Sequence, residues 1–104
     1  EQSSDPIVTA EQCESLAKLL GEHKIVLLRN HGIVVAGTSI EEACIRGVLL
    51  EHSAKTQVTA ATMGAFSWAT DAEALIKRKR IYRPDAMINL WEYYLRLLKK
   101  HEAT

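Results

Sequence analysis

Residues 25–36 read Ile25-Val-Leu-Leu-Arg-Asn-His-Gly-Ile-Val-Val-Ala36, two short apolar runs on either side of a polar connection. The runs are rich in β-branched residues, and Asn30 and Gly32 in the connection tolerate the backbone angles of a tight turn. The pattern predicts an antiparallel pair of strands over residues 25–28 and 33–36. Because both runs are continuously apolar, we expect both faces of the pair to be covered.

Helical patterns flank the two predicted strands. Thr9 is a candidate N-cap for a helix over residues 10–22. Ser39 and Glu42 have the spacing of a capping box, in which Ser39 accepts from the amide of Glu42 and the Glu42 side chain reaches back. They predict the start of a long helix over residues 40–62.

One face of this long helix is expected to be buried. It carries small and apolar residues at helical spacing, among them Ile40, Cys44 and Val48. Small side chains allow a helix to approach a sheet or another helix closely. We therefore expect Cys44 to be a small core residue.

Two more helices are predicted toward the C-terminus, over residues 71–79 and from Pro84 to about residue 100. The apolar stripe of the last helix is wider than a single core needs, so we expect part of it to be buried against another chain. The stripe consists of Met87, Trp91, Tyr94, Leu95 and Leu98, widened by Leu90, Tyr93 and Leu97.

The composition is that of a folded, water-soluble domain. The 104 residues include 13 basic and 13 acidic side chains, and 47% are hydrophobic, so general nucleic-acid binding and intrinsic disorder are not expected. No apolar run approaches the roughly 20 residues of a membrane span. The two cysteines are too few for a disulfide framework, which favours a reduced, cytoplasmic protein. The chain begins with Glu1 and not with methionine, which suggests a processed or excised piece.

Two short strands bury little and leave open edges, so further strands are expected from elsewhere. We predict that residues 1–104 are the C-terminal part of a single larger α/β domain. In this division residues 1–8 form an N-terminal arm, residues 9–63 the helix–strand–strand–helix core, and residues 64–104 C-terminal helices at an interface. The isolated chain is not expected to fold as a stable monomer.

His31 is the first candidate functional residue. It follows a predicted buried strand and precedes Gly32, whose missing Cβ lets a ligand approach the imidazole. Such a histidine suits a metal ligand or an acid–base group, or it is a turn residue whose ring bonds a backbone group. One histidine does not make a site, because a catalytic zinc needs three protein ligands.

The stretch Val26-Leu-Leu-Arg-Asn-His-Gly-Ile-Val-Val-Ala-Gly-Thr-Ser-Ile-Glu-Glu-Ala43 resembles the C-terminal signature of the class II aldolase/adducin family, and residues 50–57 resemble the helix that follows it. The resemblance implies a three-layer α/β/α domain, commonly tetrameric. It also implies a divalent metal, zinc first with manganese or iron as alternatives, held by three histidines. His31 would be the third ligand. The other two come from a His-x-His pair that this chain lacks, so a companion chain or N-terminal segment would supply them.

The resemblance also implies a reaction. Enzymes of the family are metal-dependent lyases that cleave or form C–C bonds, by aldol cleavage or by decarboxylation of a hydroxy-carbonyl or hydroxy-aromatic acid, through an enediolate-like intermediate. Tyr82, before the last helix, would be the catalytic proton donor that a neighbouring subunit supplies, and otherwise packs before Pro84. Arg29 would bind a substrate carboxylate, and otherwise links the sheet to a helix.

Two other functions remain open on the same scaffold. Adducins resemble the Arg-Asn-His-Gly segment too, so the chain could be a structural or interaction domain without metal. A metal-dependent oxygenase is the second alternative. The basic run of residues 77–80 is read as a solvated helix end, so neither nucleic acid nor membrane is an expected partner. The substrate and the metal are left undecided.

Overall fold

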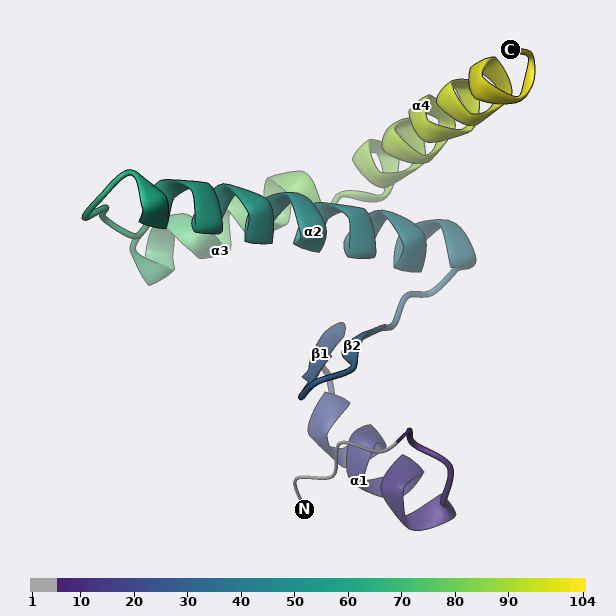
Figure 1. The fold of residues 1–104 in the computed structure, drawn as a ribbon, viewed down its shortest axis with the longest axis vertical. Coiled ribbons are helices and arrows are strands. Elements are labelled where there is room, and N and C mark those ends of the chain that lie inside the picture. Colours follow the sequence, from purple (N-terminus) through teal and green to yellow (C-terminus); the bar gives the residue numbers. More distant parts are fainter. Residues whose placement is uncertain (1–5) are drawn as a thin grey trace. The chain divides into compact units, whose positions relative to one another are not determined.

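The computed structural model describes residues 6–104, so most of the predicted arm over residues 1–8 lies outside the described residues. The chain divides into two compact units, the first ending at Gly37 and the second running from Thr38 to Thr104. Each unit is considered by itself. The elements, labelled in Figure 1, are α1 (Ala10–Leu20), β1 (Ile25–Leu28), β2 (Gly32–Val35), α2 (Ile40–Thr62), α3 (Asp71–Ile81) and α4 (Pro84–Glu102).

The predicted antiparallel strand pair is confirmed in the first unit. β1 pairs with β2 so that Val26 lies opposite Val34 and Leu28 opposite Gly32. The connection is a three-residue turn in which the amide of His31 donates to the carbonyl oxygen of Leu28 at 3.2 Å. Asn30 has a φ of 62° and Gly32 a φ of 146°. These left-handed angles explain why β2 begins at Gly32, one residue earlier than predicted.

The helix α1 precedes the hairpin and packs against β1. Thr9 caps it as predicted, because its side chain accepts from the amide of Gln12 while the Gln12 side chain accepts from the amide of Thr9. The helix ends two residues earlier than predicted. Gly21 takes a φ of 47°, and its amide donates to Ala17 at the end of the helix.

One face of the hairpin is bare in this unit. Val26 is buried, and it shares a face with Val34. The opposite face carries Leu27 and Ile33, which are 72% and 43% exposed. Among the described residues of this unit, the expected covering of both faces is therefore not present, and the three-layer arrangement stays a prediction.

The second unit begins with the long helix α2, as predicted. Ser39 accepts from the amide of Glu42, but the Glu42 side chain accepts from Thr38 and not from the Ser39 amide, so the predicted reciprocal box is wrong in that half. The predicted buried face is also wrong, since Cys44 is exposed and Ile45 is fully buried. Apolar residues lie all around α2, and packing against α4 selects the face that carries Ile45.

The last two helices have the predicted starts and are slightly longer than predicted. Thr70 and Glu73 form a reciprocal capping box at α3. Pro84 lies in the first turn of α4, where its missing N–H costs nothing. Met87 of α4 is buried, and α4 packs against α2. No helix within residues 6–104 combines the length and the apolar character that crossing a membrane requires.

Candidate functional site

His31 lies at the tip of the hairpin in the first unit. It is the last residue of the three-residue turn, and its backbone is fixed by the bond to Leu28 and by the strand that starts at Gly32. The residue is exposed, and it lines the groove described next. The imidazole is therefore mounted on a short, hydrogen-bonded turn, which is a suitable support for a ligand or an acid–base group.

A groove of about 840 Å³ runs between α1 and the hairpin. His31 and Arg29 both line it, because they flank Asn30 in the same turn. Helix α1 adds Glu11 and Ser15, four residues apart and so on one helical face. Most of the remaining lining is apolar: Pro6, Ile7, Leu16, Leu19, Leu27, Leu28 and Val34.

Two of these polar residues were not predicted from the sequence. Glu11 and Ser15 have the four-residue spacing that places them on one face of the first helix. The sequence does not show that this face of the helix points toward the hairpin turn. The structure brings Arg29 and His31, the two predicted residues of this unit, to the same groove.

The described residues do not by themselves fit a metal centre. Within residues 6–104, no group of three or more His, Cys, Asp and Glu side chains lies close enough together to hold a metal ion. His31 offers one nitrogen donor, whereas a catalytic zinc site uses three protein ligands. A metal at His31 would need its other donors from polypeptide outside this part of the chain.

The second unit contains a tightly bonded polar cluster at the start of α2. The Glu42 carboxylate accepts from the amide of Thr38 at 2.8 Å and from the Thr38 hydroxyl. It also accepts from Arg46, whose Nε lies 2.9 Å away, and the Glu42 and Arg46 side chains are only 20% and 12% exposed. The bonds from Thr38, followed by the bond from Arg46, lower the pKa of Glu42 from 4.5 to about 2.

Tyr82 belongs to this second unit, where it follows α3 as its C-cap. The Arg46 guanidinium carbon lies 5.0 Å from the centroid of the Tyr82 ring, within the range of a cation–π contact. Tyr82 also lines a pocket of about 340 Å³ together with Ser39, Glu42 and Met87. The four-residue spacing of Glu42 and Arg46 in a helix predicts an ion pair between them. Nothing in the sequence indicated its contact with Tyr82.

Comparison with known proteins bears on the first unit and the start of α2. Residues 4–58 match the family model for the class II aldolase and adducin N-terminal domain. A curated relative is the meiotically up-regulated gene 14 protein of Schizosaccharomyces pombe, 39% identical over 54 residues, which are 52% of this chain and 21% of that protein. The chain thus spans about a fifth of the length of the relative it matches. No solved structure matches.

The matched segment contains α1, the hairpin with His31, and most of α2. It ends before α3 and α4. Since the match covers just over half of the 104 residues, the chain belongs to the class II aldolase/adducin family.

Proposed function

We propose that this chain is the C-terminal part of a divalent-metal-dependent lyase, and that it contributes the ligand His31 to a site completed by other polypeptide. The lyase would cleave or form a C–C bond in a hydroxy-carbonyl or hydroxy-aromatic acid. One observation carries the proposal. The hairpin turn, which lies in the family segment, presents an exposed imidazole and a guanidinium to one groove.

The residues of this chain would have distinct roles. The turn holds the His31 imidazole in place, and Arg29 would bind a carboxylate of the substrate through its planar fork of donors. The apolar lining of the groove would exclude water from the rest of an organic acid. Tyr82 would donate a proton to the site of a neighbouring subunit. A bound divalent ion, zinc first with manganese or iron as alternatives, would supply Lewis acidity.

The hairpin itself supports the need for other polypeptide. The exposed apolar face at Leu27 and Ile33 can take a further layer. The outer strand edges, which no other strand among residues 6–104 pairs with, can take further strands. A companion segment that adds them would complete a three-layer α/β/α domain. That segment would also carry the two missing metal ligands.

The test compares metal content in matched histidine variants. The protein, purified at its full natural length with any chain that accompanies it, is analysed by mass spectrometry for bound zinc, manganese and iron. We expect His31→Ala to reduce the bound metal at least tenfold. His23→Ala is the control, because His23 is also exposed in the first unit but does not line the groove. Equal metal content and affinity in wild type and His31→Ala would remove His31 from the site.

The alternative is an adducin-like interaction domain without metal. The observation that favours it is the absence of a three-donor cluster among residues 6–104, together with a family description that names adducin beside aldolase. In that case no preparation binds metal at micromolar concentration. His31→Ala would then leave both the fold and the assembly unchanged.

A further inference from the structure

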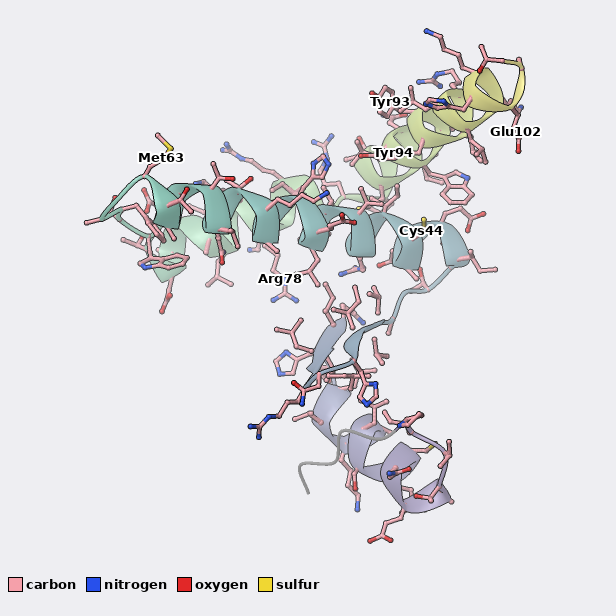
Figure 2. All side chains as sticks on the ribbon, viewed as in Figure 1. Cys44, Met63, Arg78, Tyr93, Tyr94 and Glu102 are labelled. Carbon is pink, nitrogen blue, oxygen red and sulfur yellow. The ribbon has the colours of Figure 1, made fainter. Side chains whose placement is uncertain are left out.

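The backbone of Tyr82 and its ring are held by different elements of the second unit. As the C-cap of α3, Tyr82 donates its backbone amide to the carbonyl oxygen of Arg78 at 3.1 Å. Figure 2 labels Arg78 on this helix. The bond fixes the backbone but leaves the ring free to turn about the side-chain bonds. The ring is contacted instead by Arg46 of α2, whose guanidinium carbon lies 5.0 Å from the ring centroid.

Arg46 is itself held in place by its neighbours on α2. Its Nε donates to one carboxylate oxygen of Glu42 at 2.9 Å, and its Nη2 donates to the same oxygen. The other carboxylate oxygen accepts from the amide and the hydroxyl of Thr38. The Arg46 side chain is 12% exposed, so little water competes for its donors. A guanidinium that is already fixed through two nitrogens loses little further freedom when it contacts a ring.

We propose that Arg46 is a positioning residue for Tyr82 and keeps its ring in one orientation. The face of a tyrosine ring is negative, so a cation above it attracts the ring. Proton donation requires the hydroxyl to lie within hydrogen-bond reach of the acceptor, and an oriented donor loses less freedom at that moment. The inference rests on the proposed function and deepens it, because it names the residue that orients the proton donor.

The pocket beside Tyr82 has apolar walls that do not orient a ring. Pro84, Met87 and Ile88 of α4 line this pocket of about 340 Å³ together with Tyr82. Because apolar contacts are non-directional, these side chains restrict the space around the ring without selecting how it faces. The attraction of a cation does select the orientation, since it acts on the face of the ring and not on its edge.

The first experiment reads the surroundings of the ring from a fluorine label. The protein is produced with 3-fluorotyrosine, at its full natural length with any chain that accompanies it, and is stripped of metal with a chelator. Tyr82→Phe assigns the ¹⁹F resonance of Tyr82. Tyr93 and Tyr94 of α4, labelled in Figure 2, are internal references. We expect the Tyr82 resonance to be displaced from that of free 3-fluorotyrosine.

Three arginine variants separate the charge of Arg46 from its packing. Arg46→Met keeps an apolar stem of similar length, so a merely structural role would survive it. We expect this variant to remove more than half of the displacement of the Tyr82 resonance. Arg46→Lys, which keeps a cation, should retain at least half of the displacement. Arg78→Met is the matched control, because it removes an exposed guanidinium one turn before Tyr82 and should change the displacement by less than a tenth.

The second experiment observes the same contact from Arg46 and leaves its pair with Glu42 intact. An aromatic ring shifts the resonances of protons above its face upfield. In protein labelled with ¹⁵N-arginine, the Nε proton of Arg46 should therefore lose an upfield shift in Tyr82→Leu and keep it in Tyr82→Phe. If circular dichroism shows that Arg46→Met has lost helix, this second experiment decides.

Several results would overturn the proposal. They are a Tyr82 resonance without displacement, a displacement that Arg46→Met leaves in place, and losses that are equal in Arg46→Lys and Arg46→Met. An Nε resonance that Tyr82→Leu does not move would overturn it as well. Failure of the proposed lyase function is a separate result. It would appear as equal metal content in wild type and His31→Ala, whereas both sets of spectra are recorded without metal.

Discussion

Replacing Glu42 by glutamine should destabilise the second unit more than any other single loss of charge near the start of α2. The carboxylate accepts hydrogen bonds from Thr38 and from Arg46 on both of its oxygens. The amide of glutamine offers one acceptor oxygen and turns a donor toward groups that are donors themselves. The Arg46 guanidinium, whose side chain is 12% exposed, would lose the carboxylate with which it forms an ion pair.

The expected size follows from the pKa of Glu42. Its depression from 4.5 to about 2 corresponds to at most about 3 kcal/mol. Because the side chain is 20% exposed, screening by water reduces this figure to about 2 kcal/mol. A carboxyl with a lowered folded pKa stabilises the fold above the unfolded pKa. The contribution of Glu42 is thus complete above pH 4.5 and is lost as the pH falls toward 2.

The assay is urea unfolding of the full chain followed by circular dichroism, at one fixed protein concentration because association also contributes to stability. At pH 7, Glu42→Gln should lower the free energy of unfolding by about 2 kcal/mol. The matched control is Glu41→Gln, in the same helical turn, which should cost about 0.5 kcal/mol or less. Toward pH 2 the difference between wild type and Glu42→Gln should shrink. Equal losses in the two variants at pH 7, or a difference that does not depend on pH, would refute the reasoning.

Three further results are expected. Asn30→Val should destabilise the hairpin by about 1–2 kcal/mol because a β-branched residue is strained at a φ of 62°. The amide hydrogens of β1 and β2 should then exchange faster, and the control Asn30→Gly should leave their exchange rates unchanged. Thr70→Ala should destabilise α3 by about 1 kcal/mol because the amide of Glu73 loses the side-chain oxygen to which it donates. The loss should appear as lower helix content. Thr56→Ala, in the middle of α2, is the control. The isolated chain should show a thermal midpoint that rises with protein concentration, because within residues 6–104 only Val26, Ile45 and Met87 are buried; a concentration-independent cooperative transition would contradict this.

The local structure could be predicted from the sequence because it depends on residues that are close together in the chain. The strand runs, the turn at Asn30, the cap at Thr9 and the proline at the start of α4 each act within a few residues, and the structure confirms them. Which face of α2 is buried could not be predicted from the sequence. Apolar residues surround that helix, so its orientation depends on where α4 packs and not on periodicity.

The candidate site likewise has features that the sequence predicts and features that it does not. Arg29 and His31 reach one groove because only Asn30 separates them in the turn, and that nearness is a local property. The contact of Arg46 with Tyr82 joins positions far apart in the sequence, and it depends on how α2 meets the end of α3. No spacing rule covers such a pair. The proposed role of His31 as a metal ligand requires donors that residues 6–104 do not supply, and it stays a prediction.

The bare hairpin has a consequence for the cell that makes this protein. Within residues 6–104, β1 and β2 pair only with each other, and Leu27 and Ile33 are exposed. Such a pair is a template onto which an extended, apolar polypeptide can add by backbone hydrogen bonding. The same strand edge can pair with the native strand or with an unrelated polypeptide, and whichever binds first determines the product. Synthesis without the companion segment proposed above should therefore send this chain into insoluble aggregates, and co-synthesis with that segment should keep it in solution.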